Sequence, residues 1–257
     1  MIRLEGVTKR YGHFTAVHPL DLHIRRGEVF GFLGPNGAGK TTTIRMIAGV
    51  LRPTAGRILL GGHDVVREGA AAKRLLGYIP DRPFLYEKLT GAEFLHFVSG
   101  LWGRDGATAR RRGAELLELF ELEPWKDTLI ESYSHGMRQK LLIASALVHG
   151  PELIVVDEPM VGLDPRAARL VKDLIRTFAE QGGTVFLSTH TLEVAEALCG
   201  RIAILHEGRI RAVGSMSELR AEAEAGTAGL EEIFLKLTGA AGISELVASL
   251  RAGPEVE

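Results

Sequence analysis

The stretch "EVFGFLGPNGAGKTTTIRMIAGV", residues 28–50, joins an apolar strand, a glycine-rich turn and the start of a helix. Within it, Gly34–Thr41 has the spacing of a phosphate-binding loop in its usual place between a strand and a helix. Small residues let backbone N–H groups surround phosphate oxygens, and the helix N-terminus adds positive potential. We expect Lys40 to reach the β- and γ-phosphates and the Thr41 hydroxyl to bind Mg²⁺. An ordinary glycine-rich turn is the alternative, but it leaves the full spacing unexplained.

A second chemical signal lies downstream in "LIVVDEP", residues 153–159. Four apolar residues predict a buried strand, and Asp157 and Glu158 follow at the edge where open α/β sheets bind ligands. Asp157 is placed to hold Mg²⁺ through water, and Glu158 to orient and deprotonate an attacking water. Acid pairs after strands also serve as turn or cap residues. Downstream of a phosphate loop, however, this pair indicates nucleotide hydrolysis.

The rest of the chain alternates strands and helices around these two motifs. Short strands are expected within residues 2–35, a hairpin at 56–66, and only helices from 90 to 149. The uniformly apolar strands predict a parallel sheet that is buried on both faces. The later elements are expected as a strand at 153–157, a helix at 166–179, a strand at 184–190, a helix at 191–199 and a strand at 201–205.

Composition narrows the class of protein. A chain of 257 residues suits one large domain, or one domain with a subdomain. The net charge of -1 gives no reason to expect nucleic acid as a partner. Cys199 is the only cysteine, which fits a reducing compartment. No apolar run approaches the ~20 residues of a membrane span, and the N-terminus lacks a signal-peptide core, so we expect a cytoplasmic chain.

The block "SYSHGMRQKLLIASALVHGPELIVVDEPMVGLDP", residues 132–165, resembles the signature-to-D-loop region of ABC-transporter ATPases. The resemblance extends over nearly the whole chain, with the motifs in family order. It implies an α/β P-loop NTPase of the ABC-ATPase fold, with a mixed core sheet, an N-terminal antiparallel β-subdomain and a helical insertion. We therefore expect an ATPase domain at 1–214, with a helical subdomain at about 84–150, and a C-terminal helical tail at 215–257.

The resemblance also implies roles for individual residues. Tyr11 takes the place of the aromatic that stacks on adenine, with a strand-end core aromatic as the alternative. Glu158 and His190 match the catalytic acid and the switch histidine. Ser134 and Gly136 match the signature motif, which grips a γ-phosphate held by the opposite subunit of a homodimer. The other implied nucleotide-binding residues form the Walker A loop: Gly34, Pro35, Asn36, Gly37, Ala38, Gly39, Lys40, Thr41 and Thr42.

Two sites depart from the family pattern. The signature carries His135 for a glycine and Met137 for a glutamine, and a methionine cannot make a polar ribose contact. In "GYIPDRPFLYEKLT", residues 77–90, Asp81 stands where the family usually has a glutamine. Asp81 either acts on Mg²⁺ through water or is a turn residue. The implied metal set is thus Thr41 and Asp157, with Asp81 as a further candidate.

The same stretch raises a question about partners. Its knuckle, defined as Phe84, Leu85, Tyr86 and Leu89, either seats a short helix of a membrane subunit or closes the local core. The tail has two similar apolar faces, which either pack on their own domain or contact a partner. One face consists of Leu230, Ile233, Phe234 and Leu237, and the other of Ile243, Leu246, Val247 and Leu250.

These observations favour an ATP-binding and ATP-hydrolysing subunit that drives a transporter through separate ABC-type transmembrane permease subunits. The variant motifs look most like the branch that serves ABC-2-type exporters. We expect a Mg²⁺-dependent homodimer on the cytoplasmic face of the membrane, with no nucleic acid partner. A non-transport ABC ATPase would fit a more basic chain or a second cassette, and a binding-only regulator would not need Lys40, Asp157, Glu158 and His190.

Overall fold

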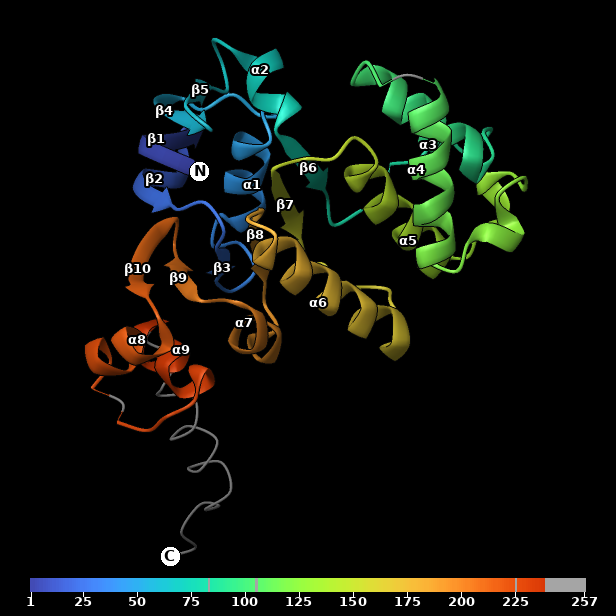
Figure 1. Ribbon diagram of the computed structural model, residues 1–257. Coiled ribbons are helices and arrows are strands. Elements are labelled where there is room, and N and C mark those ends of the chain that lie inside the picture. The colour runs from blue at the N-terminus through green and yellow to red at the C-terminus, as the bar shows by residue number, and fades with distance from the viewer. Residues whose placement is uncertain (83, 105, 225, 239–257) are drawn as a thin grey trace, which may run out of the picture.

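A six-stranded sheet forms the centre of the computed structural model, which describes residues 1–82, 84–104, 106–224 and 226–238. The strand order is β10-β9-β3-β8-β7-β6 (Figure 1). Only β10 is antiparallel to its neighbour, because a two-residue turn joins it to β9. The mixed core sheet predicted from the sequence is therefore confirmed. The strands are β3 (Val29–Leu33), β6 (Leu76–Ile79), β7 (Leu153–Asp157), β8 (Thr184–Thr189), β9 (Arg201–His206) and β10 (Arg209–Gly214).

Both faces of this sheet are buried, as its apolar strands predict. Side chains alternate between two hydrophobic clusters, since successive residues of a strand point to opposite faces. Phe30 and Phe32 of β3 join Phe186 of β8 in one cluster, and Val29 and Leu33 lie in the other. The central strands β3, β7 and β8 are buried along their whole length. This packing fixes the strand ends, where the chemistry-bearing residues lie.

A second, antiparallel sheet covers one face, in the order β2-β1-β4-β5. It consists of β1 (Ile2–Tyr11), β2 (Phe14–Ile24), β4 (Ala55–Leu60) and β5 (His63–Asp64). The predicted hairpin corresponds to β4 and β5. β2 spans 11 residues, longer than the short strands expected in this region, and includes Pro19. Proline is tolerated there because β2 is the edge strand of this sheet.

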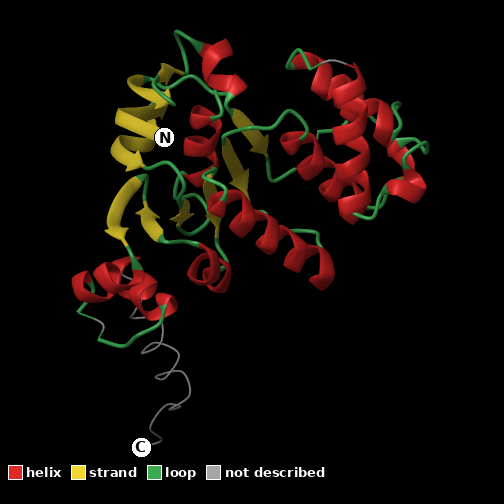
Figure 2. Ribbon diagram, viewed as in Figure 1, coloured by secondary structure: helices red, strands yellow, loops and turns green. Residues whose placement is uncertain are grey.

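The helical insertion projects to one side of the core sheet (Figures 1 and 2). It contains α3 (Gly91–Leu101), α4 (Gly106–Leu119) and α5 (His135–Leu147), with two short 3₁₀ turns at Glu123–Trp125 and Ile130–Ser132. Thr90 and Glu93 form a capping box that starts α3. As expected, the described residues 90–149 contain no strand, only an isolated bridge between Thr90 and Leu129.

The remaining helices lie around the core sheet. They are α1 (Lys40–Ile47), α2 (Gly69–Arg74), α6 (Pro165–Glu180), α7 (Leu192–Leu198), α8 (Met216–Glu222) and α9 (Leu230–Thr238). Leu230 and Ile233 of α9 are buried in the same cluster as the core helices, and Phe234 and Leu237 pack against it. The first apolar face of the tail therefore packs on its own chain. The second face lies outside the described residues, and the division at residue 214 stays a prediction.

Candidate functional site

The phosphate loop lies between β3 and α1 and is held open by glycines. Gly37 and Gly39 have φ angles of 81° and 103°, a region that favours glycine. A Cβ on Gly34 would lie 2.4 Å from the Leu205 carbonyl oxygen, so this position also excludes larger residues. These constraints fix a loop whose backbone can surround an anion.

Lys40 at the start of α1 is 7% exposed. Its Nζ donates hydrogen bonds to the carbonyl oxygens of Gly34, at 2.6 Å, and Pro35, at 3.2 Å. Burial lowers the pKa of Lys40, while the charges of Glu158 and Asp157 oppose that shift. The ammonium group is thus folded into the loop and faces the two acids, where a phosphate would replace the carbonyl partners.

Asp157 ends β7 and is 2% exposed. Its Oδ1 accepts a hydrogen bond from the Ser188 hydroxyl, and its buried Oδ2 has no partner among the described residues. Burial raises the pKa of Asp157, the hydroxyls of Ser188 and Thr41 lower it, and the charges of Asp81 and Glu158 raise it further. A carboxylate oxygen without a partner, close to the Thr41 hydroxyl, fits the oxygen ligands that Mg²⁺ prefers.

Asp81 follows β6 and is half-buried. Its charge acts on Asp157, so it belongs to the same electrostatic site. However, the described part of the chain contains no cluster of three or more His, Cys, Asp or Glu side chains that could hold a metal ion. A role in binding Mg²⁺ through water and a role in the turn therefore both stay open for Asp81.

Glu158 and His190 lie together beyond the ends of β7 and β8. Oε1 of Glu158 accepts from the His190 backbone N–H at 3.0 Å and lies 2.7 Å from His190 Nδ1. Oε2 accepts from the Thr189 hydroxyl at 3.0 Å. Glu158 has a φ of 52°, which is uncommon for a residue with a side chain and typical of strained functional positions. The predicted catalytic acid and switch histidine are thus direct neighbours.

The signature residues lie at the start of α5. Ser134 is the N-cap, and its hydroxyl accepts from the Met137 backbone N–H at 3.3 Å. Met137 packs against the core, in keeping with the expected loss of a polar contact. The structure adds a contact that the sequence did not indicate: a Cβ on Gly162 would lie 2.4 Å from His135 Nε2. The signature therefore touches the loop that follows Glu158 in the same chain.

Other predicted residues lie apart from one another. The Tyr11 ring is 49% exposed at the end of β1, with Lys9 Nζ 5.1 Å from its centroid. The alternative of a core aromatic is therefore wrong, because the residue is exposed, with the Lys9 ammonium over its ring, and stacking on adenine stays a prediction. Ser134 and Gly136 lie at the start of α5, on the opposite side of β6 and β7 from α1 (Figure 1). The predicted signature residues and the phosphate loop thus lie apart within one chain.

The sequence analysis missed Ser188 and Thr189 as residues of the site. Both lie at the end of β8. The Ser188 hydroxyl hydrogen-bonds Asp157, which ends β7, and the Thr189 hydroxyl hydrogen-bonds Glu158, which follows it. The "LST" pattern shows only an apolar strand that ends in two hydroxyl residues. What places them is the parallel register of the strands, in which Asp157 pairs with Ser188.

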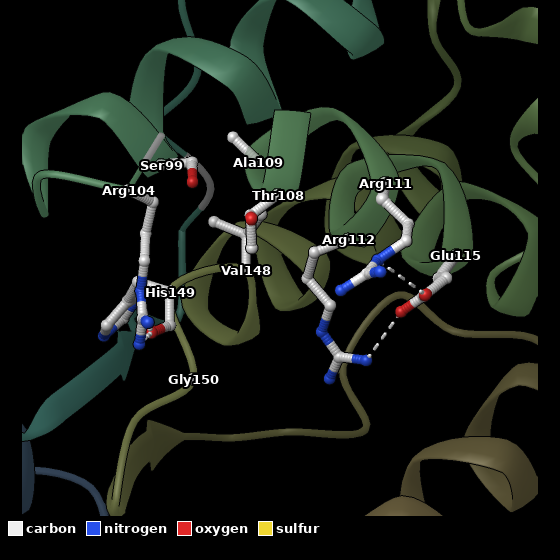
Figure 3. A pocket seen from close by; sticks show the side chains of 10 residues that line it. All are labelled: Ser99, Arg104, Thr108, Ala109, Arg111, Arg112, Glu115, Val148, His149 and Gly150. Atoms are coloured by element: carbon white, nitrogen blue, oxygen red, sulfur yellow. Dashed lines mark hydrogen bonds and ion pairs between the residues drawn. The ribbon is translucent and has the colours of Figure 1, made fainter. Parts of the chain in front are cut away.

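A pocket in the helical insertion lies away from these residues (Figure 3). Its polar lining is engaged in holding the insertion together: Arg111 and Arg112 pair with Glu115, at 3.9 and 3.2 Å. Arg104 Nε donates to the His149 carbonyl oxygen at 3.1 Å. None of the predicted nucleotide-binding residues lines this pocket.

Comparison with known proteins finds similar sequences that are described as ATP-binding proteins. A family model described as ABC transporter matches residues 17–161. A daunorubicin resistance ATP-binding protein of Streptomyces coeruleorubidus is 42% identical, over 93% of this chain and 78% of that protein. A Nod factor export ATP-binding protein of Ralstonia nicotianae is 39% identical, over 85% of this chain and 68% of that protein.

Solved structures agree with these matches. The dimeric, post-hydrolysis state of the ATP-binding cassette MJ0796, bound to ADP and phosphate, aligns with a TM-score of 0.77 and 27% identity. The alignment covers 84% of this chain and 99% of that one. The described residues contain no helix with both the length and the apolar character needed to cross a bilayer.

Proposed function

The chain belongs to the family of ABC transporter ATP-binding subunits, and on that premise we propose that its ATP hydrolysis drives export through separate transmembrane permease subunits. The chain binds and hydrolyses ATP, as its family does. Two similar proteins are described by antibiotic resistance and by Nod factor export, which supports the exporter branch. The variants "YSHGM" and "GYIPD" of this sequence point to the same branch.

Each group of site residues performs a separate task in this proposal. Tyr11 stacks on adenine, and the loop from Gly34 to Thr42 surrounds the phosphates, with Lys40 on the β- and γ-phosphates. Thr41 would bind Mg²⁺ directly, and Asp157 and Asp81 would hold it through water, so that the ion could neutralise developing phosphate charge. Glu158 takes a proton from the attacking water, and His190 holds Glu158 and the γ-phosphate. Ser134 and Gly136 bind the γ-phosphate that a second copy carries.

The observation that carries the proposal is the contact between Glu158 and His190, 2.7 Å apart at the ligand-binding edge of the sheet. A general base must be oriented by a neighbour and lie close to the phosphate that the loop holds. Burial of Lys40 beside the two acids puts the loop and the base in one site. A protein that only bound ATP would not need this oriented pair.

The proposed partners follow from the exposed surfaces. The separation of Ser134 from the phosphate loop favours a homodimer that closes on two ATP molecules. Phe84 and Tyr86 of the knuckle are 81% and 61% exposed, which favours docking of a permease helix. Such a chain works on the cytoplasmic face of the membrane, where ATP is present.

The replacement Glu158→Gln tests the catalytic assignment. It keeps the shape and the hydrogen-bonding oxygen but removes the base, so turnover should fall by about 10²–10⁴ with ATP binding retained. Because its ATP is not hydrolysed, the variant should also elute as a dimer from a size-exclusion column. Glu152→Gln, at the opposite end of β7, is the matched control and should keep wild-type turnover. A Glu158→Gln protein that hydrolyses ATP at the wild-type rate contradicts the assignment.

A further inference from the structure

The hydroxyl of Thr189 has two partners that fix the direction of its single proton. Thr189 ends β8 and is 2% exposed. Its Oγ1 accepts from the Thr191 backbone N–H at 3.0 Å, and it lies 3.0 Å from Glu158 Oε2. The Thr191 N–H occupies a lone pair, and a carboxylate can only accept. The Thr189 proton therefore points at Oε2.

The two oxygens of Glu158 are consequently unequal. An ionised carboxylate has about four lone-pair positions, two on each oxygen. On Oε1, both are taken by His190, through its backbone N–H at 3.0 Å and its Nδ1 at 2.7 Å. On Oε2, the Thr189 hydroxyl takes one. Among the hydrogen bonds of the described residues, the position left for a water is thus on Oε2.

We propose that Thr189 is a positioning residue that makes Oε2 of Glu158 the atom that accepts the proton of the attacking water. The water proton moves to Oε2 while the water oxygen bonds to the γ-phosphorus. The bond from that phosphorus to the oxygen bridging to the β-phosphate breaks, which releases ADP and phosphate. This inference rests on the proposed role of Glu158 as the base and adds the group that orients it.

The backbone around Glu158 explains why the side chain needs such support. Its φ of 52° places the residue in the left-handed region, which costs a non-glycine residue some strain that surrounding contacts must offset. The Glu158 N–H donates to the Ser188 carbonyl oxygen at 3.0 Å, which brings the next residue, Thr189, alongside the carboxylate. The strand register thus places the Thr189 hydroxyl beside Glu158, and this hydroxyl orients the Glu158 carboxylate.

The replacement Thr189→Val tests the role of the hydroxyl, because valine keeps the branched shape. Loss of a group that orients a functional side chain typically costs about 10–100-fold in activity. We expect kcat to fall by about that factor and the KM for ATP to change less than about twofold, because Thr189 acts on the base and not on the nucleotide. Thr189→Ser restores the hydroxyl and should recover most of kcat.

Thr184→Val is the matched control for the loss of a buried hydroxyl. Thr184 begins the same strand, is fully buried, and accepts from the Gly27 backbone N–H at 3.1 Å. Its removal should leave kcat unchanged. Should Thr189→Val fail to fold, Thr189→Ala with the same serine rescue replaces it. A kcat near wild type in Thr189→Val, or a Thr189→Ser protein as slow as Thr189→Val, overturns the proposal.

A double variant separates this inference from the assignment of Glu158. In single-turnover experiments on Glu158→Gln, adding Thr189→Val should cause no further loss, since both changes act through one carboxylate. A further tenfold loss of the single-turnover rate would mean that Thr189 acts on another group, and it would contradict the positioning role. If Glu158→Gln alone keeps the wild-type rate, the assignment of the base fails instead.

Discussion

The imidazole of His149 illustrates how a single buried residue contributes to the acid stability of the protein. His149 lies just after α5 and lines the pocket of the insertion (Figure 3). Its Nε2 lies 3.1 Å from the Leu76 carbonyl oxygen, and the Trp102 ring centroid lies 4.5 Å from that of the imidazole. Because a carbonyl only accepts, Nε2 carries the proton. Nδ1 is buried and has no partner in the described part of the chain. Burial lowers the pKa of His149 to about 4, with a smaller contribution from the charge of Arg104.

Stability should therefore depend on pH through His149. The folded pKa lies below the ordinary value of 6.5, so the unfolded chain binds the proton first. The contribution is fully present above pH 6.5 and is lost as the pH falls towards about 4. At 1.36 kcal/mol per unit, the loss near pH 5 is about 2 kcal/mol. Chemical denaturation at about pH 7.5 and pH 5 measures it.

His149→Gln keeps a donor for the Leu76 carbonyl but cannot be protonated in this range. Its free energy of unfolding should therefore fall less between the two pH values than that of the wild type. His13→Gln, at an exposed position, is the control and should keep the wild-type difference. Equal pH dependence in His149→Gln and the wild type would show that the buried imidazole is not the cause.

At the scale of elements, the sequence predicted best where a pattern is local and long. Helix α6 was expected at 166–179 and spans Pro165–Glu180, because Asp164 caps it and its apolar residues follow helical spacing. The shorter α2 and the edge strand β10 were missed. β10 (RIRAVG) lacks the continuous apolar run that predicted β8 and β9, and the six residues of α2 span too few turns for helical periodicity to show.

The residues of the site could likewise be predicted from the sequence only where a local motif contains them. The phosphate loop, Asp157 and Glu158 were predictable because a short local motif carries each of them. The hydroxyl of Thr189 and the ring of His135 were not, because their partners are distant in the sequence. Thr189 meets Glu158 across the register of two strands, and His135 meets Gly162 across a helix and a strand. Such pairs exist only once the chain has folded.

The knuckle before α3 is partly buried and partly exposed. Leu85 and Leu89 pack against the core, as closure of the local core requires. Phe84 and Tyr86 point outward, and Tyr86 meets Phe97 edge to face at 5.4 Å. The docking surface proposed for the permease helix therefore reduces to the exposed rings of Phe84, Tyr86 and Phe97.

Phe84→Ala should leave the melting temperature and basal ATPase nearly unchanged, because its ring is 81% exposed. It should nevertheless weaken retention of the permease in a pull-down from membranes, since an exposed ring acts only in the complex. Trp125→Ala, on another part of the insertion, is the control and should retain the partner.

Truncation of a buried ring in the same insertion should, unlike Phe84→Ala, lower the stability. Phe94 is 4% exposed, and its truncation to alanine should cost about 3–5 kcal/mol and lower the melting temperature. If Phe84→Ala is destabilised in this way and still binds the permease, the docking role is wrong.

At the scale of the whole molecule, the separation of Ser134 from the phosphate loop favours the proposed homodimer. Helix α1, which begins at Lys40, lies on one side of β6 and β7, and helix α5, which Ser134 caps, lies on the other (Figure 1). The similar cassette MJ0796 is described as dimeric. Two identical chains related by a two-fold axis would bring each Ser134 to the phosphate loop of the other, so that each ATP is held by both.

Lys40→Ala and Ser134→Arg should therefore fail in different ways. Lys40→Ala removes a phosphate-binding charge, so ATP affinity of the monomer should fall. Ser134→Arg should leave that affinity intact and block ATP-induced dimerisation, measured by light scattering in the Glu158→Gln background. The loss of the N-cap costs about 1 kcal/mol, and Ser134→Ala controls for it. If Ser134→Arg weakens ATP binding by the monomer as much as Lys40→Ala, the serine belongs to its own chain's nucleotide and the two-chain site is wrong.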